Sequence, residues 1–134
     1  MAKLETIEGI GGAYAQKLRQ AGIATIEALL EKGATPKGRE EITETTGISE
    51  KLVLRWVNHA DLFRIKGIGE EYADLLEAAG VDTVVELAQR NPEHLYQKMA
   101  STNAEKKLVR KMPTQSQVGD WINQAKALPR KVTY

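Results

Sequence analysis

The chain of 134 residues contains no cysteine. Without thiols it has neither a disulfide framework nor a thiolate metal site, and it needs nothing from an oxidising compartment. No apolar run approaches membrane-spanning length, and the stretch Met1–Glu5 lacks the apolar segment of a signal peptide. We therefore expect a cytoplasmic protein that has no membrane partner.

Aromatic side chains and net charge are also scarce. Aromatic residues make up 5% of the chain and include a single phenylalanine, Phe63, so there is little material for a base-stacking platform. The net charge is +1, and basic and acidic residues are balanced in each half of the chain. Neither half is a basic domain, which argues against nucleic-acid binding through bulk electrostatics.

The motifs that carry catalytic chemistry are missing. The sequence has no P-loop, no G-x-S-x-G and no H-E-x-x-H, and its carboxylates are scattered along predicted helix faces. His59 and His94 have no companions at metal-ligand spacing. We predict a protein that is not an enzyme, with no catalytic residues, no metal site and no cofactor.

What the sequence does contain is an internal repeat. Residues 7–30 and 65–88 are identical at eleven of twenty-four positions, with an offset of fifty-eight residues. No linker rich in proline, glycine or serine separates the two copies, so we expect two similar halves in contact. The predicted organisation is a first domain at residues 1–62, a second at 63–129 and a tail at 130–134.

Each copy of the repeat opens on Gly-Ile-Gly, at Gly9–Gly11 and Gly67–Gly69. Two glycines that tolerate positive φ on either side of an apolar anchor let the chain reverse sharply with its backbone exposed. After the first turn, one helical face is apolar, at Tyr14, Ala15, Leu18 and Ala21. The pattern predicts two short helices joined by a tight turn, with Gly22 ending the second.

Helical periodicity and capping residues continue along the whole chain, and no strand-like alternation of useful length occurs. Thr25, Thr35, Ser49, Thr83, Asn91 and Thr114 or Ser116 are expected N-caps. The predicted helices cover about residues 3–7, 12–21, 26–32, 36–46, 50–63, 70–79 and 83–90, followed by one from residue 92, one at 103–111 and a last one ending near residue 128. We predict an all-α fold of roughly nine to eleven short helices.

The repeated residues also carry a resemblance. The pattern L-x-x-I-x-G-I-G-x-x-x-A-x-x-L-x-x-A-G, at Leu4–Gly22, resembles the helix-hairpin-helix motif of DNA repair and recombination proteins. Together with residues 23–30 and 44–50, it is similar to the small N-terminal helical domain of the RadA/Rad51 recombinases, without an ATPase core. The whole chain is similar to a bacterial family of tandem-hairpin proteins known only as a domain of unknown function. The resemblance implies two tandem helix-hairpin-helix (SAM-like) domains packed together.

A hairpin of this type binds DNA by presenting backbone N–H groups at the start of its second helix to a phosphate oxygen, where the helix dipole also favours negative charge. Such contacts ignore base identity. In the first hairpin the candidate residues are Gly9, Ile10, Gly11, Gly12 and Ala13, with Lys17 and Arg19 nearby. The alternative is that this turn only joins two helices.

The second hairpin offers Lys66, Gly67 and Gly69, but Glu70 and Glu71 stand where a phosphate would sit. Acidic residues in a first helical turn complement the helix dipole, so we favour a structural role for this hairpin.

A basic cluster occurs later in the chain, at Lys106, Lys107, Arg110 and Lys111, which would share one face of the predicted helix at 103–111. A solvated helix face explains the same residues. The main hypothesis is sequence-nonspecific DNA binding, mainly through the first hairpin. The alternative is a protein–protein adaptor in which the hairpins are structural.

Overall fold

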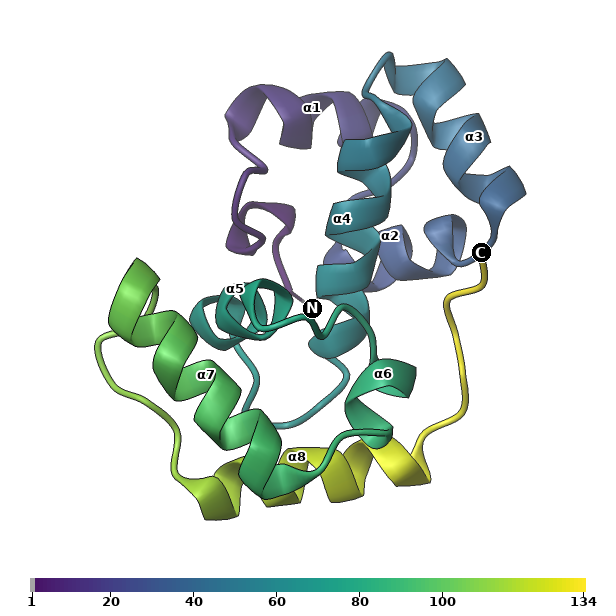
Figure 1. Cartoon of the computed structure of the whole chain (residues 1–134). Helices are drawn as coiled ribbons and strands as arrows, with labels where there is room; N and C mark the ends of the chain where they lie inside the picture. The colour runs from purple at the N-terminus through teal and green to yellow at the C-terminus, as the bar shows by residue number, and fades with distance from the viewer. Residues whose placement is uncertain (1) are drawn as a thin grey trace. The chain divides into compact units, whose positions relative to one another are not determined.

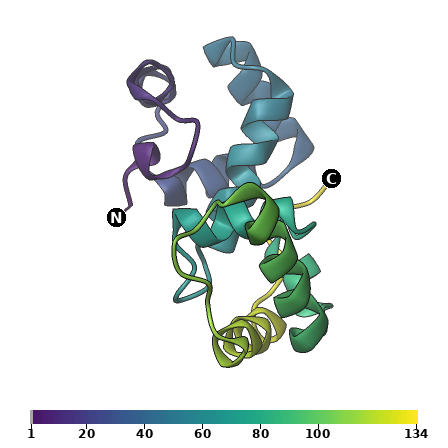
Figure 2. The same cartoon turned by 60° about the vertical axis from the view of Figure 1, so that its left-hand side comes forward.

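In the computed structural model, residues 2–134 are described, and they fold into helices joined by short connections (Figures 1 and 2). These residues form eight α-helices and one short 3-10 helix, and their only β pairing is an isolated antiparallel bridge between Lys3 and Thr25. The predicted all-α class is confirmed. The chain divides into two compact units: Met1–Asp61 together with Lys131–Tyr134, and Leu62–Arg130.

The first unit contains the 3-10 helix η1 (Leu4–Thr6) and helices α1 (Gly12–Gln20), α2 (Ile26–Gly33), α3 (Pro36–Thr46) and α4 (Glu50–Leu62), the last of which ends at the boundary between the units. The predicted caps at Thr25 and Thr35 are confirmed, because their hydroxyls accept hydrogen bonds from the backbone N–H groups of Ala28 at 3.0 Å and Gly38 at 3.1 Å. Gly47 ends α3 in the left-handed region, as its sequence position predicts. Local chemistry therefore sets most helix boundaries in this unit.

The second unit contains α5 (Glu70–Ala78), α6 (Val84–Ala88), α7 (Pro92–Lys106) and α8 (Gln115–Ala127). Helix α8 packs against both α6 and α7, and α7 also contacts α5. Their buried side chains form one hydrophobic core, which includes Leu76, Leu87, Leu95, Met99 and Trp121. Helix α8 begins with a capping box: the Thr114 hydroxyl accepts from the N–H of Gln117, and the Gln117 side chain accepts from the N–H of Thr114.

The predicted helix at residues 103–111 is wrong beyond Lys106. Helix α7 ends there, Lys107 adopts the left-handed conformation with φ of 52°, and a loop leads on to α8 (Figure 1). The Asn103 side chain explains the early end, because its amide donates to the carbonyl of Val109 at 3.1 Å and its carbonyl accepts from the N–H of Val109 at 2.9 Å. These two bonds and the burial of Val109 stabilise the loop in place of another helical turn.

Residues 131–134, predicted to lie in a tail, pack against the first unit. The Arg39 guanidinium donates to the carbonyls of Gly33 at 2.8 Å and of Thr133 at 2.7 Å, and the N–H of Thr133 donates to the carbonyl of Ala34 at 2.8 Å. Val132 is buried. Burial lowers the pKa of Arg39 below its ordinary value, since the charged form loses water, and the carbonyl bonds offset that loss. We call Lys131–Tyr134 the C-terminal strap.

Deleting the C-terminal strap should destabilise the first unit by about 2–4 kcal/mol, because it exposes the pocket of Val132 and removes an acceptor from buried Arg39. The measurement is the urea midpoint of the full chain and of the chain ending at residue 130. Lys131→Ala is the control, since its ion pair with Glu31 is exposed and is worth less than about 1 kcal/mol. Equal midpoints for the deletion and the full chain would contradict a stabilising strap.

Candidate functional site

The turn that precedes α1 is a tight reversal with an apolar anchor. Gly9 has φ of 94°, the N–H of Ile10 donates to the carbonyl of Ile7 at 3.1 Å, and the Ile10 side chain is buried. Gly11 has φ of −83°, which any residue adopts, so only the first of the two glycines uses its tolerance of positive φ. The first glycine makes the reversal, and the second serves as the N-cap of α1.

Helix α1 begins without a side-chain cap. The Gly11 carbonyl accepts from the N–H of Ala15 at 2.9 Å, but the N–H groups of Gly11, Gly12 and Ala13 donate to no described residue. Gly9, Gly11, Gly12 and Ala13 are all exposed. Among the described α-helices only α1 and α5 start this way; the others have a Thr, Ser or Asn cap. The first turn therefore presents free donors at the positive end of a helix dipole.

An aromatic pair supports this turn. Trp56 of α4 is fully buried and meets the Tyr14 ring edge-on, with 5.2 Å between ring centroids. Its indole nitrogen lies beneath Gly9, where an added Cβ would be 3.5 Å from Nε1. That N–H finds no acceptor among the described residues. Trp56 belongs to the core of the first unit, and its contact with Gly9 fixes the turn on α4.

The basic residues near the first turn differ from those the sequence suggested. Arg19 lies in the last turn of α1 and pairs with Glu5, with Nη2 2.8 Å from Oε1, and this hydrogen bond lowers the pKa of Glu5 below its ordinary value. Arg55 of α4, which the sequence analysis missed, is closer to the turn. Its Nη1 would be 3.4 Å from a Cβ on Gly9. Lys17 is exposed on α1.

The turn before α5 has the same geometry. Gly67 has φ of 100°, the N–H of Ile68 donates to the carbonyl of Ile65 at 3.3 Å, and the Gly69 carbonyl accepts from Ala73 at 2.9 Å. A Cβ on Gly67 would lie 2.8 Å from Nε1 of Trp121, whose ring is 5.2 Å from that of Tyr72. The two turns are thus built from equivalent residues.

Several acidic residues lie around the second turn. Glu70 and Glu71 occupy the first turn of α5, at the repeat positions of Gly12 and Ala13. Gln124 of α8 holds the backbone of Lys66 through two hydrogen bonds, of 2.9 and 3.1 Å. The same Gln124 amide donates to Oδ2 of Asp120 at 2.9 Å, which places another carboxylate beside this turn.

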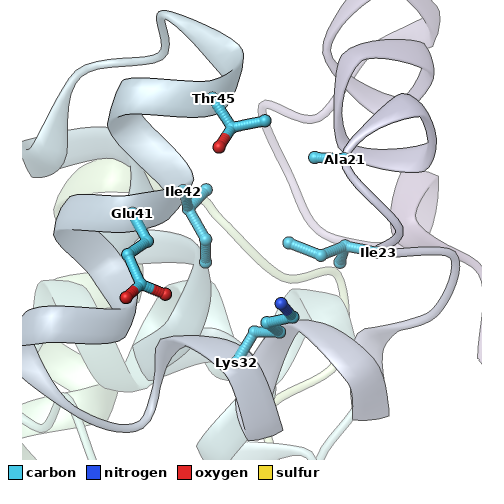
Figure 3. Close-up of a pocket in the computed structure, with 6 residues that line it drawn as sticks. All are labelled: Ala21, Ile23, Lys32, Glu41, Ile42 and Thr45. Atoms are coloured by element: carbon cyan, nitrogen blue, oxygen red, sulfur yellow. The ribbon is translucent and has the colours of Figure 1, made fainter.

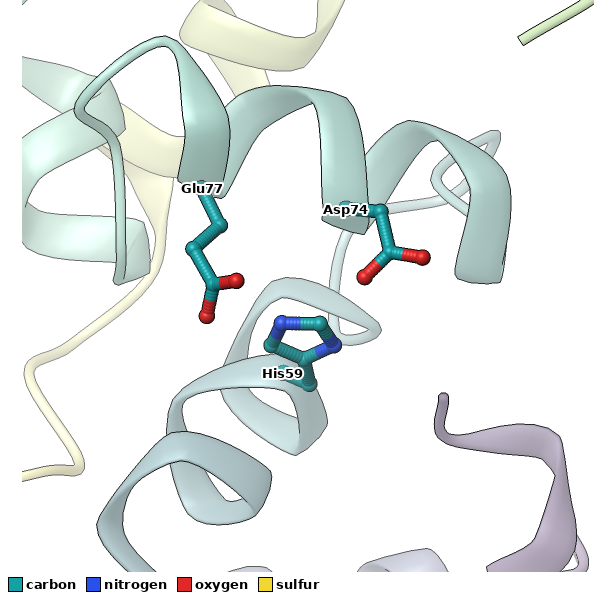
Figure 4. A group of neighbouring side chains, drawn as sticks. All are labelled: His59, Asp74 and Glu77. Atoms are coloured by element: carbon teal, nitrogen blue, oxygen red, sulfur yellow. The ribbon is translucent and has the colours of Figure 1, made fainter. Parts of the chain in front are cut away.

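Helix α5 carries further acidic residues. Asp74 and Glu77 lie one turn apart on α5, with carboxylates on the same side of the helix, and His59 is a buried residue of α4 (Figure 4). Two carboxylates on one helix supply fewer ligands than a structural metal site needs. Asp74 and Glu77 are only partly exposed, and the carboxylate oxygens of Glu70 are buried.

The four basic residues of the predicted helix at 103–111 do not share one helical face. Lys106 ends α7 and Lys107 caps it, while Arg110 and Lys111 belong to the loop. All four side chains are exposed. The prediction that they form one basic helix face is wrong, because the helix on which it depended ends at Lys106.

A pocket in the first unit has a volume of about 80 Å³ (Figure 3). Ile23 and Ile42 form its apolar side, and Lys32, Glu41 and Thr45 contribute polar groups. Ligand pockets are typically several hundred Å³, and a water takes about 30 Å³ of liquid. This pocket has room for only a few water-sized groups.

The family model of the Domain of unknown function (DUF4332) matches residues 8–128 of the chain. The chain belongs to the DUF4332 family. The expected membership of a family of unknown function is therefore confirmed, and the likeness to recombinases stays a prediction. The match covers both turns, whereas the C-terminal strap lies outside it. No solved structure matches this DUF4332 chain.

Within residues 2–134 of this DUF4332 protein, every helix is too short or too polar to cross a membrane.

In this DUF4332 chain, Gly67→Ser should lower the free energy of unfolding by about 2–3 kcal/mol, because it forces a side chain into positive φ and against Trp121. Gly69→Ser is the matched control, with φ of −98° and open space for a Cβ, and its effect should stay within about 0.5 kcal/mol. Urea denaturation followed by tryptophan fluorescence measures both. Equal losses for the two variants would show that the turn does not depend on the first glycine.

Proposed function

We propose that this protein is a non-enzymatic nucleic-acid-binding protein, in which residues 9–13 form the hairpin of a helix-hairpin-helix motif and hold a DNA phosphate without sequence preference. The observation that carries the proposal is the exposed, uncapped start of α1. The N–H groups of Gly11, Gly12 and Ala13 belong to exposed residues and donate to no described residue. A phosphate oxygen is the acceptor that such a group of donors fits.

The small residues at this position favour a polymer backbone as the ligand. Gly11 and Gly12 have open space around a Cβ position, and neither has a side chain that would cover the start of α1. The groups offered at this turn are backbone amides, which suit contact with phosphates rather than with base edges. Tandem helix-hairpin-helix domains packed together, and a cytoplasmic location, remain predictions.

The number of nearby cations sets the expected strength of binding. Lys17 is an exposed basic side chain on α1 that is not held by Glu5, so we expect about one phosphate to be neutralised per site. Counterion release then gives a slope of about −1 in a plot of log affinity against log salt. Binding should be weak and should fall further as salt rises.

A protein–protein adaptor is the second candidate, and the acidic second turn favours it. Glu71 and Asp120 place exposed carboxylates near the second turn, where the first unit has open amides. Such a surface suits a basic protein segment better than a nucleic acid. Both functions can occur in one chain, because they use different units.

Gly11→Asp tests the proposal by placing a carboxylate on the amides of α1. Aspartate is a better N-cap than glycine, so the variant should gain a few tenths of a kcal/mol in stability while losing DNA binding. The measurements are an electrophoretic shift with duplex DNA at low salt and a urea denaturation curve. Adding Lys17→Glu to the Gly11→Asp variant should abolish the remaining DNA binding.

Gly69→Asp is the matched control, because Gly69 is the N-cap of α5 and also has open space around it. This variant should bind DNA as the unmodified protein does. If duplex, single-stranded and branched DNA and RNA all fail to shift with the unmodified protein, the nucleic-acid proposal is wrong. If the protein is an adaptor, the Gly11→Asp, Lys17→Glu variant should still bind its protein partner. Cleavage of DNA by the unmodified protein in the presence of Mg²⁺ would contradict a non-enzymatic role.

A further inference from the structure

The C-terminal strap is an extended segment that docks on the first unit. Residues 131–134 have neither helical nor strand structure, and they pack on the first unit although residues 62–130 before them form the second. Thr133 is 94 residues from Arg39 and 99 from Ala34 in the sequence, yet it hydrogen-bonds both (Figure 1). Contacts with the first unit, rather than with sequence neighbours, therefore hold the strap in place.

The first part of this docking surface binds an extended backbone. The Arg39 guanidinium donates to the carbonyl of Thr133 at 2.7 Å, and the N–H of Thr133 donates to the carbonyl of Ala34 at 2.8 Å. Val132 is only 2% exposed, so its side chain fills an apolar site next to these bonds. Backbone hydrogen bonds combined with a pocket for one side chain are a common way of recognising an extended peptide.

Tyr134 makes the recognition more specific. Its hydroxyl donates to Oδ1 of Asn58 at 3.2 Å, and the Asn58 side chain belongs to a buried residue of α4. The Tyr134 ring also lies over the Arg39 guanidinium, with 5.8 Å between the guanidinium carbon and the ring centroid. We call the surface at Ala34, Arg39 and Asn58 the strap-docking surface.

The strap-docking surface needs an occupant. Arg39 is a buried cation, and its guanidinium donates to the carbonyls of Gly33, Ala34 and Thr133. Removal of the strap takes one of these acceptors away and exposes apolar surface, which makes an empty docking surface unfavourable. No helix has to unfold for the strap to leave, so its release is a local opening.

We propose that the strap-docking surface also binds the C-terminal strap of a second copy of this chain, so that two copies exchange straps. The strap of a second copy has the same residues and restores every contact that the released strap gave up. The chain's own strap competes at an effective concentration of about 1 mM, so exchange occurs near that protein concentration or where docking within one chain is blocked. The exchange uses none of residues 9–13 and is independent of the proposed function.

The test divides the docking surface and the strap between two variants of the full chain. Arg39→Met removes the guanidinium and keeps an apolar stem, so this docking variant has an intact strap that its own chain no longer binds. The strap variant, Val132→Gly with Thr133→Pro, lacks the apolar side chain and the N–H donor, so its docking surface is open. Circular dichroism melting shows that both variants are folded.

Sedimentation equilibrium of an equimolar mixture of the two variants should show a complex with twice the mass of one chain, whereas each variant alone should keep the mass of one chain. A strap that is docked about a hundredfold more often than released, at an effective concentration of about 1 mM, corresponds to a dissociation constant of about 10 µM between chains. An excess of a free peptide with the sequence of residues 128–134 should dissociate the complex.

Lys37→Met is the matched control for Arg39→Met. Lys37 is an exposed residue of the same helix, so this variant should keep its own strap docked and form no complex with the strap variant at about ten times that dissociation constant. If the docking and strap variants form no complex, or if their complex persists in excess peptide, the inference is wrong.

A second measurement does not depend on the folding of Arg39→Met. The unmodified chain, refolded from urea at about 1 mM, should form dimers, because the strap of a neighbouring chain is then as concentrated as the chain's own. The strap variant should stay monomeric under the same conditions. Failure of the unmodified chain to dimerise, or equal dimer formation by the two proteins, would contradict strap exchange and would leave the nucleic-acid proposal unaffected.

Discussion

The packing of a positive-φ glycine on a buried tryptophan is the constraint on which each unit depends. Gly9 lies over Trp56 and Gly67 over Trp121, so a side chain at either glycine would strain the backbone and meet an indole ring. This contact fixes the turn against a helix distant in sequence and sets where the next helix begins. Because the turn is tight and its second glycine carries no side chain, that helix starts with open amides.

Repetition of this unit allowed its two copies to diverge in charge while keeping one backbone. The first copy has Glu8, small residues and Arg55 around its turn, and the second has Lys66, Glu70, Glu71 and Asp120. None of these residues is part of the hydrophobic core. The charge of the side chains around the turn can therefore change without changing the fold. The shared backbone explains the sequence identities, and the differing charges explain why we propose different roles for the two turns.

The sequence predicted the features that local chemistry controls. Caps such as Thr35 and Asn91, each followed by proline, lie within a few residues of the helix starts they define. It did not predict the loop after Lys106, which depends on the Asn103 side chain, or the C-terminal strap, which depends on Arg39, far away in sequence. The place of Arg55 beside Gly9 was not predicted either, because that contact joins residues far apart in the sequence. Aligning the two tryptophans would have paired Arg55 with Asp120.

The central claim is that the first turn offers unpaired amides to a phosphate backbone and the second does not. The most direct measurement is a ¹H–¹⁵N NMR titration of the protein with a short DNA duplex, which reports each backbone amide separately. The account predicts that the amides of Gly11, Gly12 and Ala13 shift first and furthest, while those of Gly69 and Glu70 stay in place. Shifts confined to residues 106–111 or to α5, with none at Gly11–Ala13, would contradict it.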